Sequence, residues 1–478
     1  MKLKTALIVS GIIAVSGCGG SGEDSSPPPT TTLPTNESSP DPTAAITDSS
    51  KYMDIGIHDP SIVKVDDTYY LFGSHLAAAK STDLMQWEYI SQLSANNLVD
   101  ESPLFNTYST EFAEGIAWTD NFSGSWASDV IQSPAGDFWF YYNHCAQDNP
   151  DTAERDEVCW HRSYLGVATA ESVEGPYVDQ GIFIRSGQRD GELETYPVDG
   201  VTAYDPAVHP NAIDPAAFYD KDKNMWLVYG SYSGGIYVLA LDEQTGKPEA
   251  GQGFGKHLVG GDFNAIEGAF VIYSPDSDYY YLFWSNAGFS ADGGYNIRVA
   301  RSRSPDGPYL DAAGNDMVDA TVANNFGTKL LGSHLWASAF GETSAQYGYN
   351  SPGHNSALYD EALDKYLLFT HTRFPVEEGR YANQEAHAVR VHEMWLNADD
   401  WLVVSPDRYA PLEGDDIADA GDIAGDYRLV LQGNDSNGDE HVSAYVTLTN
   451  QGRAINGELN GTYTVSYTHL TLPTICSV

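Results

Sequence analysis

Five residues that can carry or transfer a proton occupy matching places in five related phrases. They are four carboxylic acids and one imidazole: Asp59, Asp129, Asp214, Glu267 and His354. Hydrolysis of a glycosidic bond requires two carboxyl groups across a sugar, because one protonates the leaving oxygen while the other activates water or attacks. A third carboxylate nearby raises the pKa of the acid by like-charge repulsion. The set therefore suits glycoside hydrolysis, provided that the fold brings its members together.

Any one of these residues has a simpler explanation. An Asp before Pro, as in Asp59-Pro60, is by itself more often a residue that caps or forms a turn. That explanation is poor for the whole set, since buried carboxylates are costly and a ring of them more so. The phrases are 58–63, 126–131, 213–218, 266–271 and 353–358.

A short aromatic segment follows each phrase, after a polar turn that contains Asp, Gly, Asn or Lys. These segments are rich in aromatic and aliphatic residues and lack helical periodicity, which predicts β-strands over 68–72, 138–142, 225–229, 279–284 and 365–369. Five copies of a several-stranded unit predict an all-β fold, a five-bladed β-propeller over residues 51–410. The innermost strand of each propeller blade lines the central channel, so the five matching residues should converge at one end of it.

Aromatic residues near these strands could form a platform for a sugar, because aromatic rings stack on furanose and pyranose faces. Any single one of them is more often a core residue, and we favour Trp126 and Tyr232. The candidates are Trp118, Phe122, Trp126, Tyr232 and Trp284.

The five phrases, together with His387-Ala388-Val389-Arg390, resemble those of glycoside hydrolase family 43 over residues 57–406. They are most similar to its endo-α-1,5-L-arabinanases with an added C-terminal β domain. The resemblance implies an inverting mechanism with Asp59 as general base, Glu267 as general acid and Asp214 as the group that orients and tunes Glu267. Inversion predicts a separation between base and acid of roughly 6.5–9.5 Å.

The same resemblance implies ligand-binding roles. A metal ion, usually calcium, would be held by His354 and waters, although His354 as a hydrogen-bonded core histidine remains an alternative. Substrate-binding roles fall to Asn211, Ser231, Tyr232, Ser233, Trp126 and Asp129.

The sequence departs from the family pattern in two places. Ser128 stands where proline is usual, which should alter only local rigidity. An insertion over residues 147–162 leaves the shape of the cleft open, so the enzyme could be endo- or exo-acting. Cys145, just before this insertion, and Cys159, within it, could form a disulfide in an oxidising compartment.

The two ends of the chain indicate export. Residues 1–17 read as a lipoprotein signal peptide, because two lysines and an apolar run precede Val15-Ser16-Gly17-Cys18, which resembles a bacterial lipobox; an ordinary signal peptide is the alternative. Residues 18–50 form a polar tether. We expect a lipid on Cys18 to anchor the protein at the outer membrane or cell surface.

After the propeller, residues 411–464 indicate a small, incomplete C-terminal β domain with strands over 427–431 and 442–448. Residues 465–478 resemble a translated sequencing-library adaptor, so we treat them as a non-native tail.

Charge limits the partners. With 67 acidic and 24 basic residues, the formal net charge is -43, which argues against nucleic acid and anionic membranes, since both attract basic surfaces. A neutral polysaccharide such as arabinan is not repelled, and we expect a monomer. Alternatives to an endo-arabinanase are an exo-acting arabinofuranosidase or xylosidase on the same propeller, and a non-catalytic glycan-binding surface lipoprotein.

Overall fold

The computed structural model describes residues 51–92, 102–119, 124–146, 162–188, 204–336, 346–374, 386–411 and 424–451, and the strand residues 453–456, 459–462, 464–465 and 470–471. The predicted signal peptide and tether, Cys159 and Phe122 lie outside the described residues, as does most of the suspected tail.

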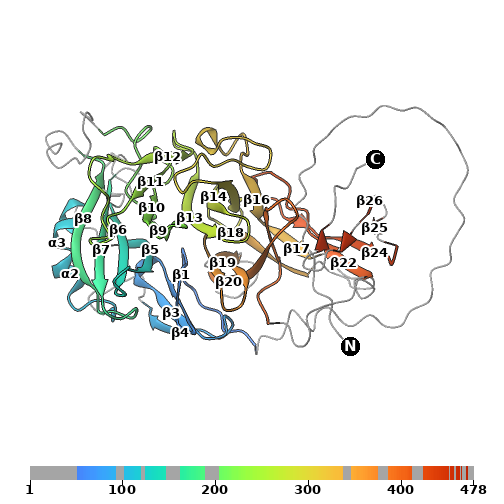
Figure 1. The fold of residues 1–478 in the computed structure, drawn as a ribbon, viewed down its shortest axis with the longest axis horizontal. Coiled ribbons are helices and arrows are strands. Elements are labelled where there is room, and N and C mark those ends of the chain that lie inside the picture. The colour runs from blue at the N-terminus through green and yellow to red at the C-terminus, as the bar shows by residue number, and fades with distance from the viewer. Residues whose placement is uncertain are drawn as a thin grey trace, which may run out of the picture.

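Five antiparallel sheets follow one another in sequence order around a ring, which confirms the five-bladed propeller (Figure 1). The first four blades have four strands each, and neighbours in sequence pair with one another. The strands of these blades are β1 (Ser61–Val65), β2 (Thr68–Phe72), β3 (Ala78–Ser81) and β4 (Glu88–Ser91); β5 (Ser125–Gln132), β6 (Phe138–Cys145), β7 (Ser163–Ala170) and β8 (Val178–Ser186); β9 (Ala216–Tyr219), β10 (Met225–Tyr229), β11 (Ile236–Ala240) and β12 (Lys256–Val259); and β13 (Ile266–Ser274), β14 (Tyr279–Asn286), β15 (Asn296–Ser302) and β16 (Thr328–Leu331).

The fifth blade is larger. Its sheet has the order β21-β20-β19-β18-β17-β23, so it includes a strand from the C-terminal part of the chain. The strands are β17 (His334–Trp336), β18 (Gln346–Asp360), β19 (Lys365–Phe374), β20 (Ala386–Leu396), β21 (Leu402–Val404) and β23 (His441–Val442).

The hairpin between the first two strands of each blade has the predicted polar turn, and each turn holds a residue with positive φ. These residues are Asp66 (52°), Gly136 (96°), Lys223 (70°), Asp278 (54°) and Asp364 (52°). The left-handed conformation reverses the chain within a few residues, which explains why Asp, Gly and Lys recur there.

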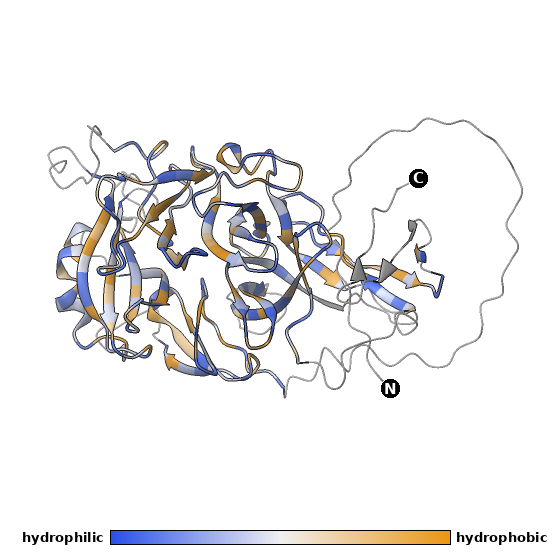
Figure 2. Cartoon of the chain, viewed as in Figure 1, coloured by the Kyte–Doolittle hydropathy of each residue, from blue (hydrophilic) through white to orange (hydrophobic). Residues whose placement is uncertain are grey.

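The core lies between the blades. Four clusters of buried hydrophobic side chains each span adjacent blades, and the aromatic second strands supply many of their members, including Phe140, Phe283 and Phe369, each 0% exposed. The second strands of the blades are buried along almost their whole length, as in β6 and β14, because neighbouring blades cover both faces of each sheet, and hydrophobic residues are frequent in the strands (Figure 2). Two short helices, α2 (Tyr108–Glu111) and α3 (Ala113–Trp118), and the 3-10 turns η1 (Ser74–Leu76) and η4 (Met317–Asp319) complete the propeller.

The ring closes where the fifth blade meets the first, and no strand is exchanged at this junction. The amide of Val389 donates to the carbonyl of Ile55 at 2.9 Å. Lys64 Nζ lies 2.7 Å from the Asp360 carboxylate, which also accepts a hydrogen bond from the Tyr69 hydroxyl. Asp360 is 1% exposed, so this ion pair is largely shielded from water.

Replacing Asp360 with Asn should therefore lower the free energy of unfolding by about 2 kcal/mol, because Lys64 would keep its charge without a partner. Chemical denaturation monitored by tryptophan fluorescence measures this effect. Asp306→Asn is the matched control, since its pair with Lys256 is largely exposed and should contribute little. An equal loss in both variants would contradict a special role of the junction.

The C-terminal part forms a second, four-stranded sheet of order β22-β24-β25-β26, with strands β22 (Gly425–Leu429), β24 (Ala444–Leu448), β25 (Arg453–Asn456) and β26 (Leu459–Thr462), and a separate pair, β27 (Thr464–Val465) and β28 (Leu470–Thr471). The strand predicted over 442–448 is divided at Ser443. Its first part, β23, pairs in parallel with β17 of the propeller, and its second part pairs with β22. The segment 441–448 thus contributes one strand to the propeller and one to the C-terminal sheet.

The structure also bears on the predicted disulfide and on membrane-spanning helices. Cys145 is disulfide-bonded, while its predicted partner lies outside the described residues. Among the described residues, no helix is long and apolar enough to cross a membrane.

Candidate active site

The candidate acids lie where the inner strands begin, at one end of the channel. Each inner strand has a residue in the left-handed conformation at this point: Asp59 (φ 55°), Ala127 (27°), Asp214 (52°), Gly268 (64°) and His354 (43°). Such a conformation is costly for residues other than glycine and is concentrated at functional sites. The kink is thus a repeated feature of the blades, and it turns the side chains of Asp59, Asp214 and His354 toward one another.

Asp59 is 6% exposed and surrounded by imidazoles. Its Oδ1 lies 2.7 Å from His58 Nδ1 and 3.0 Å from His354 Nδ1, while Ser74 Oγ donates to its Oδ2 at 2.5 Å. Burial alone would raise the pKa of Asp59, but His354 and His58 lower it well below its usual range. Asp59 is therefore ionised across the physiological pH range.

The pKa values of Asp214 and Glu267 are shifted in the opposite direction, upward. Burial, with the charge of Asp59, raises the pKa of Asp214 to about 6, although the Gly268 amide donates to its carboxylate at 3.2 Å. Burial and the neighbouring Asp214 raise the pKa of the half-buried Glu267 to about 7. The Tyr295 hydroxyl donates to Glu267 Oε1 at 2.8 Å and fixes its orientation. Glu267 can thus carry a proton near neutral pH.

Asp214→Asn should move the basic limb of the pH profile of kcat/KM to lower pH. The general acid must be protonated, so activity is lost as pH rises through the pKa of Glu267, and removing the charge of Asp214 lowers that pKa from about 7. The measurement is kcat/KM from pH 4 to 9. Asp262→Asn, which alters an exposed carboxylate on the same face, should leave the limb in place. An unchanged limb in Asp214→Asn would show that this carboxylate does not tune Glu267.

His354 connects the acids. Burial would lower its pKa, yet the charges of Asp59 and Asp214, with a smaller effect of Glu267, raise it to about 10. The structure therefore brings His354 together with the three carboxyl groups, as the repeat predicts.

Asp129 lies one step deeper in the channel. It is 2% exposed, accepts a hydrogen bond from the Ser61 hydroxyl, and accepts another from the Ala217 amide at 2.8 Å. Ser61 and Ala217 come two and three residues after Asp59 and Asp214. The position in β5 that corresponds to Asp59 is Ala127, so Asp129 links the first three blades beneath the other acids.

Hydrogen bonds between the two segments predicted to bind sugar, which contain Asn211 and Ser231, hold these segments together. Asn211 Oδ1 accepts from the Ser231 amide at 3.0 Å, and Asn211 Nδ2 donates to Ser231 Oγ at 2.9 Å. Tyr232 is half-buried, and Glu267 and Asp214, after burial itself, raise the pKa of its hydroxyl, which indicates that it lies near both acids. Ser233 is 0% exposed and its carbonyl accepts from the Phe263 amide at 3.2 Å.

The aromatic candidates differ in their surroundings. Trp284 is 0% exposed and belongs to the core, and Trp118 packs under the Arg162 guanidinium at 3.9 Å. Trp126 is half-buried with its ring 4.6 Å from that of His75, and its indole N–H has no hydrogen-bond partner among the described residues. Of these three indole groups, that of Trp126 alone has an N–H without a hydrogen-bond partner among the described residues, and this N–H is buried.

Ser128, which departs from the family pattern, donates a hydrogen bond to the Gly73 carbonyl at 3.0 Å. It thereby links the second blade to the turn before η1, which carries Ser74. The substitution replaces the stiffness of proline by a bond between blades.

Sequence reasoning missed a cluster of imidazoles around Asp59. His371 Nδ1 lies 3.7 Å from Asp59 Oδ1, the His371 ring stacks on His58 at 4.2 Å, and His387 meets His58 edge-on at 5.1 Å. Arg373 Nη2 donates to His58 Nε2 at 2.7 Å. His371, Arg373 and His387 come from β19 and β20, outside the repeated phrase; the segment 387–390 was the only signal that pointed to them.

One group of the described residues at this site could hold a cation. One ligand atom each from His58, Asp59 and His371 lie within 4.8 Å of one another, and His371 Nε2 is buried without a hydrogen bond. Two imidazoles with one carboxylate match a transition ion better than calcium, and the adjacent Arg373 opposes a further positive charge. The raised pKa of His354 favours its protonated form, which has no free ring nitrogen, so His354 would have to lose a proton to act as a metal ligand.

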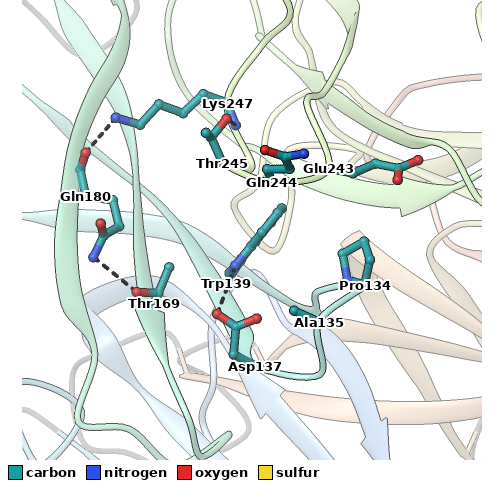
Figure 3. A pocket seen from close by; sticks show the side chains of 10 residues that line it. All are labelled: Pro134, Ala135, Asp137, Trp139, Thr169, Gln180, Glu243, Gln244, Thr245 and Lys247. Atoms are coloured by element: carbon teal, nitrogen blue, oxygen red, sulfur yellow. Dashed lines mark hydrogen bonds between the residues drawn. The ribbon is translucent and has the colours of Figure 1, made fainter.

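A cavity of about 760 Å³, separate from the candidate active site, lies between the second and third blades (Figure 3). It is lined by Asp137 of the β5–β6 turn, so it opens on the face of the propeller opposite the acids. Lys247 Nζ donates to the Gln180 carbonyl at 2.6 Å across it. Trp139, at its base, is 4% exposed, and none of the predicted site residues line it.

Two carboxyl groups with opposed pKa shifts at one end of a five-bladed propeller suit the hydrolysis of a glycosidic bond. The chain belongs to glycosyl hydrolases family 43, whose model matches residues 54–402, and a model of the family's C-terminal lipocalin-like domain matches residues 406–475.

Relatives of known activity cover most of the chain. It is 43% identical over 422 residues to the extracellular endo-α-(1→5)-L-arabinanase 2 of Bacillus subtilis (86% of this chain, 83% of the relative) and 41% identical over 429 residues to the extracellular endo-α-(1→5)-L-arabinanase of Thermotoga petrophila (88% and 84%). The crystal structure of the endo-1,5-α-L-arabinanase from Thermotoga petrophila superimposes with a TM-score of 0.77 at 38% identity, covering 89% of this chain and 90% of that one.

Proposed function

We propose that the protein is an inverting endo-arabinanase that hydrolyses α-1,5-linked L-arabinan outside the cell. The observation that carries the proposal is that the pKa values of two carboxyl groups in one cluster are shifted in opposite directions. The pKa of Asp59 is held well below its usual range, whereas that of Glu267 is raised to about 7. Groups whose environments push their pKa values apart are typical of paired acid and base catalysts.

In this mechanism Asp59 is the general base. Its carboxylate accepts a proton from a water molecule as that water attacks the anomeric carbon of the arabinose unit. Glu267 donates its proton to the leaving oxygen, so the glycosidic bond breaks without a covalent intermediate and the configuration inverts. Asp214 orients Glu267 and keeps it protonated by charge repulsion.

The surrounding residues orient the sugar. We expect the rings of Tyr232 and Trp126 to pack against the sugar. Asn211 and Ser231 hold the Tyr232 segment through their hydrogen bonds, and Ser233 holds it through its carbonyl. Asp129 supports the site from below through Ser61 rather than by sugar contact.

The resemblance to the family implies calcium, which His354 and waters would hold at this site once the imidazole has lost its proton. Bound there, the ion would supply positive charge that stabilises the ionised carboxylates. The protein residues would still carry both proton transfers.

The remaining predictions concern the whole molecule. We propose that cleavage before Cys18 and acylation anchor the protein at the outer membrane or cell surface, that residues 18–50 tether it, and that it acts as a monomer. The domain bounds proposed are 51–410 for the propeller and 411–464 for the C-terminal domain, with 465–478 as a non-native tail.

The product of linear arabinan tests the reaction. We expect a mixture of short oligomers by chromatography and, by ¹H NMR during the first minutes, a newly formed β-anomeric end. Arabinose or a single short product would indicate exo action, and an α-anomeric end would contradict inversion. Binding without hydrolysis would favour the non-catalytic lipoprotein.

A further inference from the structure

Phe289 is a large exposed side chain beside the catalytic base. It lies in the loop 287–294 between β14 and β15 and is 53% exposed. Its ring lies 6.4 Å, edge-on, from that of His58, which contacts Asp59, and the Arg373 guanidinium lies 5.4 Å from its centroid. At the other side of the loop, the Tyr232 hydroxyl reaches the Ala287 carbonyl at 3.5 Å. The loop therefore borders the site between two predicted functional groups.

The loop itself is held by several bonds. Its ends are joined because the Gly288 amide donates to the Gly293 carbonyl at 3.0 Å. Ser351 Oγ of the fifth blade donates to the Ala291 carbonyl at 3.1 Å, and Asn296 Nδ2 donates to the Gly294 carbonyl at 2.8 Å. A loop fixed at these points presents Phe289 in one place rather than as a mobile tip.

The support continues into the C-terminal domain through Arg298. This side chain is 0% exposed, and its Nε donates to Asn296 Oδ1 at 3.0 Å, at the base of the loop. Its other nitrogens donate to the Asn434 side chain and carbonyl, both at 2.9 Å, and to Ser436 Oγ at 3.0 Å. A fully buried guanidinium is costly unless all its donors are satisfied, so this contact is specific.

The loop also touches the C-terminal segment directly. A methyl group on Gly438 would lie 2.2 Å from the Asp292 carbonyl oxygen, and one on Gly294 would lie 2.6 Å from the Ser436 carbonyl oxygen. Backbone packs against backbone at both points, so neither side can move without the other.

We propose that Phe289 is a substrate-binding residue that packs against an arabinose unit next to the cleaved bond, and that the C-terminal segment 434–438 positions it. The inference rests on the proposed function. An aromatic ring is the side chain best suited to the apolar face of a sugar, and this one is exposed within contact distance of the residues around Asp59. The C-terminal domain then contributes to substrate recognition without touching the acids.

Phe289→Ala should raise KM for linear arabinan about 2- to 12-fold, the range expected for loss of one aromatic contact, with kcat nearly unchanged. Phe289→Trp should restore the wild-type KM. Leu363→Ala is the matched control, since Leu363 is 40% exposed in the β18–β19 turn on the opposite face and should not affect KM.

Gly438→Ala tests the positioning. It should raise KM in the same direction as Phe289→Ala, with kcat nearly unchanged, and should add nothing in the Phe289→Ala background. Full additivity, or a loss of kcat with a lower unfolding temperature, would overturn the role of the segment. An unchanged KM in Phe289→Ala would overturn the role of the ring while wild-type hydrolysis leaves the proposed function intact. Two results together would overturn both roles and the proposed function: a wild-type protein that does not cleave linear arabinan, and a Glu267→Gln variant that does not bind it in affinity electrophoresis.

Discussion

Glu267→Gln should lower kcat for linear arabinan by about 10²- to 10⁴-fold, the usual contribution of a general acid. The amide has the same shape and can still accept the hydrogen bond from Tyr295, but it has no acidic proton for the leaving oxygen. A sugar alkoxide is a poor leaving group, so its departure depends on that proton.

The leaving group provides the control for this variant. An aryl arabinofuranoside with an acidic phenol needs little protonation, so Glu267→Gln should retain most of its activity on it. An equal loss on both substrates would mean that Glu267 acts in some other way, for example by holding the sugar. Steady-state kinetics on the two substrates separate these outcomes.

Asp59→Asn should lower kcat by a similar factor of about 10² to 10⁴, but for both substrates alike. The variant cannot accept a proton from water, and water must attack whichever group leaves. The imidazoles of His58 and His354, which lower the pKa of Asp59, would then face a neutral amide.

The contrast between the two variants identifies the base and the acid independently. If Asp59→Asn spared the activated aryl substrate, Asp59 would be the acid and the assignment would be reversed. Unfolding temperatures near the wild-type value would show that both losses are chemical. Circular dichroism on the same preparations supplies that measurement.

The repeat in the sequence was sufficient to predict five blades and the convergence of the acids. Aromatic second strands recur with a polar turn, and that turn carries a positive φ in every blade, as at Asp66 and Asp364. Glu267 and His354 could be placed with Asp59 because inner strands of a propeller share one axis. The order of the blades follows from the same pattern.

The details of the site could not be predicted, because they depend on which residue of each phrase adopts the left-handed conformation, and the sequence pattern does not indicate that residue. Asp129 matches Asp59 in the phrase, yet the left-handed residue in that blade is Ala127, so the carboxylate of Asp129 lies deeper. His371 lies in β19 just after the repeated aromatic segment, and His387 lies in β20, so neither residue belongs to the repeated motif. Similarly, 442–448 reads as one strand, although pairing with β17 divides it at Ser443.

The junction between the first and last blades also determines when the enzyme becomes active. Asp59 belongs to the first blade to leave the ribosome, whereas His354 and His371 belong to the last, and Arg390 meets Asp54 across 336 residues of chain. Contacts between such distant segments form late, because loop closure must precede them. Until the fifth blade is made and docked, Asp59 is an ordinary solvated aspartate with one neighbouring imidazole. A chain arrested during synthesis or export therefore has no assembled base, and catalytic competence itself reports that the ring is complete.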